Sequence, residues 1–113
     1  MAEPRRGEVW SIDLGTPVGH EQGFRRPALV LSSDRWNEYA SKVVVVPFSR
    51  TSRGLGTRVE LEPTKGNGLT AISYARCEDI RSVSTLRLDR RLGRVGLVQM
   101  HAVERALAVF LEI

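Results

Sequence analysis

The first regular pattern in the chain is the stretch Gly7-Glu8-Val9-Trp10-Ser11-Ile12-Asp13-Leu14. Trp10, Ile12 and Leu14 fall on one face of an extended chain, and polar residues separate them. A period of two residues is typical of a β-strand that buries one face. The stretch therefore predicts a strand at the start of the fold and a sheet with an apolar core side.

Short apolar or alternating segments downstream predict further strands. They lie at residues 27–32, 43–46, 58–62, 70–74 and 77–83. The segment 43–46 consists of four valines, which favours a core strand, and we expect Pro47 to end it because proline cannot donate to a sheet. Between the second and third strands, Asp34 is expected to cap a short helix.

Two segments break the strand pattern. Residues 15–26 carry three glycines and Pro17 among polar side chains, which predicts a long loop. From Leu97 onward, apolar residues recur at spacings of three and four, as in an amphipathic helix. The whole pattern predicts a mainly β fold of the α+β class. We expect a small barrel or sheet of mostly antiparallel strands with a C-terminal amphipathic helix.

Length and composition bound the class of protein. With 113 residues, of which 42% are hydrophobic and 27% charged, the chain is expected to form a single globular domain over residues 1–113. Cys77 is the only cysteine, so no internal disulfide can form. The sequence shows no signal peptide and no apolar run of about 20 residues, which predicts a cytoplasmic protein with no membrane partner.

The charge balance points to an anionic partner. The net charge is +4, and of the 17 basic residues only Lys42 and Lys65 are lysines, which leaves 15 arginines. The planar donor fork of arginine matches phosphate groups and stacks on bases. A general compositional bias toward arginine is the alternative, and the charge alone does not decide between the two.

Polar side chains cluster in two places outside the strand cores. Residues 19–27 combine an imidazole, a carboxylate, an amide and two guanidiniums in a glycine-flanked loop. In the second cluster, Arg76 and Glu78 are two residues apart on an expected strand, so they should lie side by side on one face; a surface ion pair is the simpler reading of that pair. One cysteine and two widely separated histidines make no zinc site, and no metal or other cofactor is expected.

These segments resemble the MazF/PemK toxins of type II toxin–antitoxin systems. The resemblance runs from about Arg6 to the end of the chain. Its motifs are Arg6-Gly7-Glu8-Val9-Trp10, Gly19-His20-Glu21-Gln22-Gly23 before Arg26-Pro27, Val-Val-Pro at the end of the third strand, and Arg76-Cys77-Glu78-Asp79-Ile80-Arg81-Ser82-Val83. The sequence is most similar to the PemK/Kid branch. The resemblance implies an SH3-like barrel that forms a homodimer. It also implies an mRNA interferase: a sequence-specific, metal-independent endoribonuclease that cuts single-stranded RNA, arrests growth by blocking translation, and is inhibited by a cognate antitoxin.

The resemblance also implies a set of catalytic residues. Arg26 matches the arginine before the second strand, and His20 matches the histidine of the PemK branch. Arg76 and Glu78 match an arginine of acid type and an aspartate proposed as base, and Ser49 stands where many members have an active-site threonine. Glu78 is thus one methylene longer than its counterpart. Asp79 is a second departure, because many members carry glutamine at that position.

The residue types suit cleavage without a metal. In that reaction the ribose 2′-hydroxyl attacks the adjacent phosphate, a base removes its proton, cations stabilise the phosphorane, and an acid protonates the leaving 5′-oxygen. Glu78 is the expected base, and Arg26 and His20 can stabilise charge on the phosphate. The main expected role of Arg76 is to stabilise charge, and proton donation is its secondary role, since guanidinium holds its proton strongly. His20, with a reference pKa of about 6.5, is the more favourable acid.

Two loops carry residue types that read single-stranded RNA by stacking and hydrogen bonding. The predicted RNA-binding residues are Glu21, Gln22, Phe24 and Arg25 in the first loop and Arg50, Thr51, Ser52 and Arg53 in the connector after the third strand. An acidic antitoxin segment would compete with RNA for such a basic surface. Two alternatives stay open: a toxin of related fold that binds gyrase, as CcdB proteins do, and a non-catalytic RNA-binding module.

Overall fold

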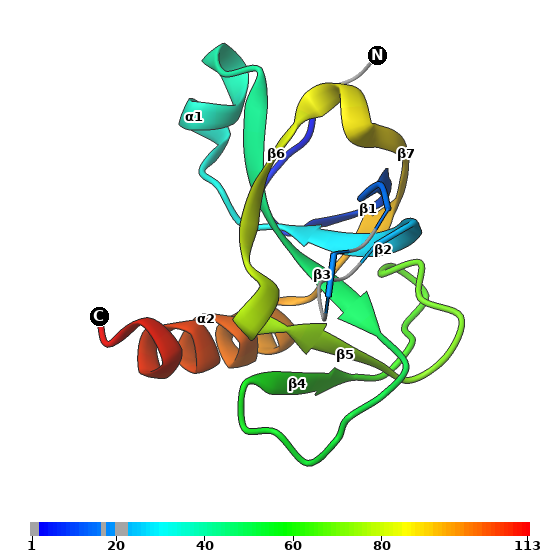
Figure 1. Cartoon of the computed structure of the whole chain (residues 1–113), viewed down its shortest axis with the longest axis vertical. Coiled ribbons are helices and arrows are strands. Elements are labelled where there is room, and N and C mark those ends of the chain that lie inside the picture. Colours follow the sequence, from blue (N-terminus) through cyan, green and yellow to red (C-terminus); the bar gives the residue numbers. More distant parts are fainter. Residues whose placement is uncertain (1–2, 17, 20–22) are drawn as a thin grey trace.

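In the computed structural model, which describes residues 3–16, 18–19 and 23–113, seven strands form one sheet (Figure 1). Every recorded strand pairing is antiparallel, and the hydrogen-bonded order is β4-β5-β3-β2-β1-β7, with β6 on β3. The strands are β1 (Glu8–Asp13), β2 (Arg25–Val30), β3 (Lys42–Ser49), β4 (Arg58–Leu61), β5 (Ser73–Arg76), β6 (Arg81–Ser84) and β7 (Leu88–Arg94). The predicted fold of mostly antiparallel strands with a C-terminal helix is confirmed, as a curved sheet left open between β4 and β7.

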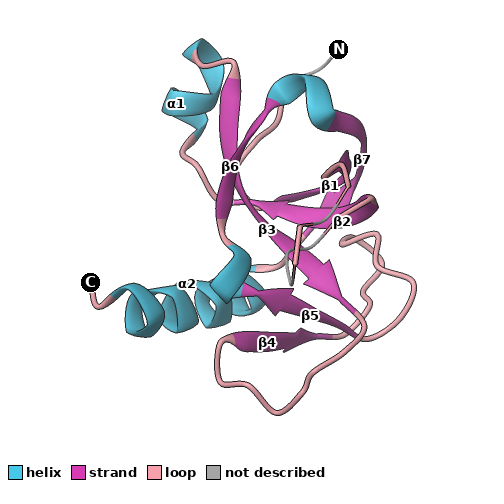
Figure 2. Cartoon of the chain, viewed as in Figure 1, coloured by secondary structure: helices cyan, strands magenta, loops and turns pink. Residues whose placement is uncertain are grey.

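Within the described residues, two α-helices and two short 3-10 helices complete the fold. They are α1 (Asp34–Tyr39), η1 (Cys77–Asp79), η2 (Thr85–Arg87) and α2 (Leu97–Leu111). The terminal helix α2 packs against β4 and η1 (Figure 2) and buries Met100, Val103 and Leu107, the stripe that the sequence period predicts. No helix in the described ranges is long and apolar enough to cross a membrane.

Strand β3 is the centre of the fold because it changes partners along its length. Residues 42–45 pair with β6 and residues 48–49 pair with β5, while the other edge of β3 pairs with β2. Both faces of β1 to β3 are buried: Val9, Leu29 and Val46 lie in the core beneath α2, and Trp10, Ile12 and their neighbours form a second cluster. The last residues of β3 therefore leave the core between the start of β2 and the start of β5.

Several boundaries differ from the sequence predictions. Strand β2 begins at Arg25 rather than Pro27, because Arg25 and Arg26 pair with residues of β1. Pro47 does not end β3; it lies inside the strand opposite Ala28, and β3 continues to Ser49. The cap of α1 is not Asp34 but Ser33, whose Oγ accepts a hydrogen bond from the Trp36 amide at 3.1 Å.

The second half of the sheet also departs from the expected strands. The strand expected at 70–74 lies at 73–76, and the one expected at 77–83 is replaced by η1 followed by β6. Strand β7 was not predicted from the sequence, because its arginines and Asp89 interrupt the alternation of apolar and polar residues. It is nevertheless a long strand, because it pairs with β1 over most of that strand's length.

Candidate functional site

Five arginines converge on one strongly polar depression of about 280 Å³, which we call the arginine pocket. Its lining residues are Arg26, Ser49, Arg50, Thr51, Arg53, Arg58 and Arg76. The sheet topology explains the convergence. Antiparallel pairing sets the beginning of one strand beside the end of its neighbour, so the start of β4 meets the end of β5, and the end of β3 meets the start of β5. The connector 50–57 joins β3 to β4 and lines the same depression.

Arg58 and Arg76 are direct cross-strand partners in the β4–β5 pair. Like charges placed opposite each other in a sheet are destabilising, and two carboxylates from η1 offset the repulsion. Arg58 Nε lies 2.9 Å from Glu78 Oε2, and Arg76 Nε lies 2.8 Å from Asp79 Oδ2. Glu78 also lies 3.7 Å from Arg76 Nε. The four side chains form a cluster of alternating charge, and its two arginines also line the arginine pocket.

The Glu78 carboxylate is held on both oxygens. Thr57 Oγ1 donates to Oε1 at 2.9 Å, and Arg58 Nε donates to Oε2 at 2.9 Å. Burial by itself raises the pKa of this carboxyl, but the hydrogen bonds from Arg58, the backbone and Thr57 outweigh it, so that the pKa lies below the usual value. Glu78 is consequently ionised at neutral pH.

Arg76 has a lowered pKa. Burial, which leaves 15% of its side chain exposed, is the main cause; Asp79 and Glu78 oppose it, while the neighbouring Arg58 and Arg26 lower the pKa further. Arg76 thus holds its proton less firmly than an ordinary guanidinium does. Next to it, burial raises the pKa of the Cys77 thiol to about 11, so Cys77 is a neutral core residue rather than a nucleophile.

Backbone contacts from two arginines hold the loops around the arginine pocket. Arg58 Nη1 donates to the carbonyl of Thr51 at 2.8 Å, and the Thr51 amide donates to Ser49 Oγ at 3.1 Å. On the opposite side, Arg26 Nε donates to the carbonyl of Gly23 at 3.0 Å. The rim of the arginine pocket is therefore fixed by arginines that also line it.

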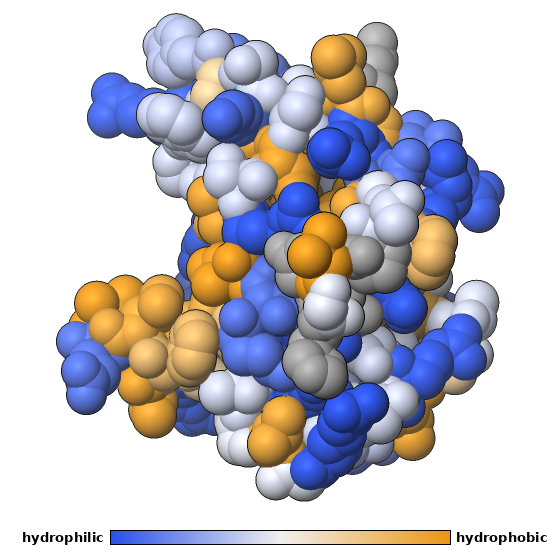
Figure 3. All heavy atoms as spheres, in the orientation of Figure 1, coloured by the Kyte–Doolittle hydropathy of each residue, from blue (hydrophilic) through white to orange (hydrophobic). Residues whose placement is uncertain are grey.

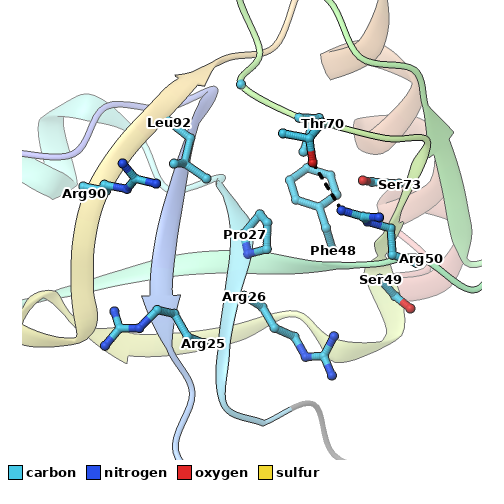
Figure 4. Close-up of a pocket in the computed structure, with 12 residues that line it drawn as sticks. Arg25, Arg26, Pro27, Phe48, Ser49, Arg50, Thr70, Ser73, Arg90 and Leu92 are labelled. Carbon is cyan, nitrogen blue, oxygen red and sulfur yellow. Dashed lines mark hydrogen bonds between the residues drawn. The ribbon is translucent and has the colours of Figure 1, made fainter.

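A second depression of about 390 Å³, the side pocket, adjoins the first and shares Arg26, Ser49 and Arg50 with it (Figure 4). Its remaining lining residues are Arg25, Pro27, Phe48, Gly68, Leu69, Thr70, Ser73, Arg90 and Leu92. Arg50 stands between the two pockets and donates from Nη2 to Thr70 Oγ1 at 3.2 Å. An anion in the arginine pocket and a flat group in the side pocket can thus be bound as neighbours.

The sequence model of the PemK-like, MazF-like toxins of type II toxin–antitoxin systems matches residues 5–111. The chain belongs to this family. It is 36% identical to endoribonuclease MazF9 of Mycobacterium tuberculosis, with 96% of this chain and 97% of that protein covered. It is 34% identical to a probable endoribonuclease MazF of Mycolicibacterium smegmatis, with 96% and 97% covered. The MazF/PemK membership predicted from the sequence motifs is confirmed.

Solved structures of MazF proteins share the fold. A mycobacterial endoribonuclease, solved in complex with its cognate antitoxin, superposes with a TM-score of 0.81 at 29% identity, over 97% of this chain and 96% of that one. MazF from Deinococcus radiodurans superposes with a TM-score of 0.86 at 24% identity over the full length of both chains. The open sheet and terminal helix described above are therefore the fold of the MazF/PemK toxins.

Most of the residues predicted for the site of this MazF/PemK toxin lie together. The arginine pocket contains the predicted residues Arg26, Ser49, Arg50, Thr51, Arg53 and Arg76. Glu78 contacts it through Arg58 and Arg76, although from η1 and not from a strand as expected. Arg25 lines the side pocket and pairs with Asp89 at 3.1 Å. Phe24 and Ser52 line neither pocket in the described part of the chain, and the predicted His20, Glu21 and Gln22 lie outside the described residues.

Sequence reasoning missed Arg58, Thr57 and Arg90. Arg58 opens a predicted strand, and the alternation of Val59 and Leu61 places its side chain on the face away from the core. The alternation does not show which strand pairs with β4. The pairing of Arg58 with Arg76 on β5 is what brings Arg58 into the site. Arg90 was missed because β7 was not recognised as a strand.

Proposed function

We propose that this MazF/PemK-family toxin is an endoribonuclease that cuts single-stranded RNA at short sequences, with the scissile phosphate bound in the arginine pocket. The convergence of five arginines on one polar depression carries the proposal. Guanidinium groups bind phosphate oxygens through paired N–H donors. The family of the chain and the relatives named as endoribonucleases support the same activity.

The reaction proceeds by attack of the 2′-oxygen on the adjacent phosphorus. The new bond joins the 2′-oxygen to phosphorus, and the bond from phosphorus to the 5′-oxygen of the next nucleotide breaks. The proton of the 2′-hydroxyl goes to a base, and an acid gives a proton to the departing 5′-oxygen. The products are a 2′,3′-cyclic phosphate and a 5′-hydroxyl end. Protein cations supply the charge that stabilises the phosphorane.

The roles of the residues follow from their chemistry. Glu78 is the base, since its lowered pKa keeps it ionised at neutral pH. Arg26 and Arg76 stabilise the charged phosphate, and the lowered pKa of Arg76 makes it a secondary proton donor. His20 is the principal acid, because an imidazolium gives up a proton more readily than a guanidinium does. Ser49, whose Oγ already accepts from the Thr51 amide, orients the connector and the phosphate.

RNA recognition is assigned to the loops that flank the phosphate site. In the connector these are Arg50, Thr51, Ser52 and Arg53, of which all but Ser52 line the arginine pocket. The other assigned residues are Glu21 and Gln22, together with Phe24 just before β2 and Arg25 at its start. Phe24 is 62% exposed with φ +60, so its ring is accessible for stacking on a base.

The toxin is proposed to act as a homodimer in the cytoplasm, to arrest growth by cutting mRNA, and to be blocked by a cognate antitoxin. The exposed end of α2 supports self-association, because Val109 and Ile113 are 80% and 89% exposed and the end of this helix is apolar (Figure 3). An acidic antitoxin segment would place carboxylates where RNA phosphates bind. A relative of the chain was solved with its cognate antitoxin, which supports this partner.

One experiment tests the proposed activity, its chemistry and its site preference together. The purified protein is incubated with a defined long RNA in EDTA, and the new 5′ ends are sequenced and tested for direct phosphorylation by polynucleotide kinase. We expect cuts at a short recurring sequence and 5′-hydroxyl ends. Cleavage that needs magnesium and leaves 5′-phosphates contradicts the mechanism. RNA bound without cleavage favours the non-catalytic module, and inhibition of gyrase without RNA cleavage favours the protein-binding toxin.

A further inference from the structure

The side pocket has the size and lining of a site for a flat, partly apolar group. Its volume of about 390 Å³ lies within the usual range of about 300–1,000 Å³ for small-molecule sites. Pro27, Phe48, Leu69 and Leu92 supply apolar surface, and Phe48 and Leu69 are almost fully buried behind it. A nucleobase is flat, apolar on its faces and polar at its edge, and it fits such a lining better than a phosphate does.

The position of the side pocket relates it to the phosphate site. The two pockets share Arg26, Ser49 and Arg50. In RNA one ribose separates a base from its own phosphate, so a phosphate in the arginine pocket brings an attached base to the adjoining depression. The side pocket thus lies where the base of a nucleotide next to the cleaved bond has to go.

The wall of the side pocket is built before any ligand arrives. Asn67 is fully buried; its Oδ1 accepts from the amides of Thr64 and Leu69 at 3.1 and 3.0 Å, and its Nδ2 donates to the Glu62 carbonyl at 2.9 Å. Gly68 has φ +72, and a Cβ there would lie 2.3 Å from the Leu92 carbonyl oxygen. The turn is therefore clamped onto β7, and a rigid wall discriminates between ligands better than a mobile one.

The charged groups around the side pocket are all hydrogen-bond donors. Arg25 is already paired with Asp89, but the Arg90 guanidinium makes no hydrogen bond or ion pair with any other residue that the structure describes, and it extends from β7 toward the pocket (Figure 4). Thr70 Oγ1 accepts from Arg50, which leaves its hydroxyl hydrogen free to donate. Because guanidinium has no acceptor, this edge favours a base that presents carbonyl oxygens.

We propose that the side pocket binds the base next to the cleaved phosphate and selects a keto base, guanine or uracil, with Arg90 as the residue that determines the choice. Guanine offers O6 and N7 and uracil offers its carbonyl oxygens to the Arg90 donor fork. Adenine and cytosine present an exocyclic amine at the equivalent edge. That amine is a donor and would face the Arg90 donors, so no hydrogen bond would form between them. This inference rests on the proposed ribonuclease activity for its biological meaning, but the binding of the base can be measured without cleavage.

The cleavage test uses RNAs in which each base that flanks the mapped cut is changed in turn. For the wild type we expect a strong preference for a keto base at one flanking position. Arg90→Ala should reduce that preference about ten- to hundredfold, while the preferences at other positions stay the same. The matched control is Arg35→Ala, which removes the same charge from an exposed arginine of α1. Helix α1 connects the end of β2 to the start of β3, whereas the side pocket lies at the start of β2 and the end of β3.

A binding arm separates this inference from the proposed function. Short oligonucleotides with 2′-deoxy substitutions cannot undergo 2′-attack, and their binding is followed through the amide resonances of Gly68, Thr70 and Ser73. Keto-base oligonucleotides should shift these resonances in the wild type and much less in Arg90→Ala. If no RNA is cut but the shifts occur, the ribonuclease proposal fails and the base site stands. Absent shifts, an amino-base preference, or an unchanged preference in Arg90→Ala overturns the base site.

Discussion

Arg58 Nε lies 2.9 Å from Glu78 Oε2, and the two side chains are only 5% and 22% exposed. Arg58 faces Arg76 across the β4–β5 pair, so the Glu78 carboxylate sits between two guanidiniums that would otherwise repel each other. The carboxylate offsets the repulsion between the two arginines, and both guanidiniums stay at the arginine pocket. The residue proposed as base thereby also supports the structure of the phosphate site.

Glu78→Gln should both abolish cleavage and lower stability. Glutamine retains the size of the side chain but loses the charge that offsets Arg58 and Arg76, and hydrogen bonds to charged groups are worth about 1.5–3 kcal/mol. We expect a folded protein with a reduced melting temperature in circular dichroism and no detectable RNA cleavage. Full cleavage activity in this variant would remove Glu78 from the role of base.

The stability difference between the wild type and Glu78→Gln should depend on pH. The pKa of Glu78 is lowered in the folded protein, so its ionised form stabilises the fold fully above the unfolded value of about 4.3. That contribution is lost as the pH falls through the folded pKa. Melting temperatures measured from pH 7 down to pH 3 should converge at the acid end, and a constant difference would contradict the assignment.

Arg76→Ala should abolish cleavage, and Arg76→Lys should restore little of it. Lysine keeps the charge but lacks the donor fork that binds phosphate oxygens and Asp79 together. Removing a donor that stabilises a charged transition state costs about 10²- to 10³-fold in rate. Single-turnover cleavage of one defined RNA measures this effect, with Arg35→Ala as the matched control for lost charge. Equal rates for the alanine and lysine variants and the wild type would place the phosphate elsewhere.

RNA binding should weaken steeply with salt, and Arg53→Ala should reduce that dependence. Each phosphate neutralised on a single strand contributes about 0.7 to the slope of log K against log salt. Arg53 lines the arginine pocket from the connector, so its removal should lower the slope by about that amount without changing the melting temperature. Fluorescence anisotropy of a labelled, 2′-deoxy-substituted oligonucleotide at several salt concentrations gives the slopes. An unchanged slope would show that Arg53 does not contact phosphate.

Gly68→Ala should destabilise the fold strongly, whereas Gly56→Ala should not. A Cβ at residue 68 would meet the Leu92 backbone at 2.3 Å and would require φ +72, while a Cβ at residue 56 meets nothing within 4 Å. We expect a loss of about 2 kcal/mol or more for Gly68→Ala in denaturant unfolding and a change within about 0.5 kcal/mol for Gly56→Ala. Similar stabilities for both variants would contradict the clamped turn.

The sequence alone determined the elements that local pattern controls. The alternation of Trp10 and Ile12 predicted β1, the valine run predicted the buried part of β3, and the spacing of Met100, Val103 and Leu107 predicted α2. Family motifs added Arg26, Arg76 and Glu78, which carry their chemistry with their residue type. These features are readable because side-chain period and residue identity are properties of the chain itself.

Only the tertiary structure decided which of these residues meet. Arg58 became a site residue because the β4–β5 register places it opposite Arg76, and Arg90 because β7 pairs with β1 beside the start of β2. Pro47 stayed inside β3 because its partner across the strand is Ala28. Register and strand neighbours depend on the packing of the whole core, whereas a sequence pattern reports only which face of its own strand a residue occupies.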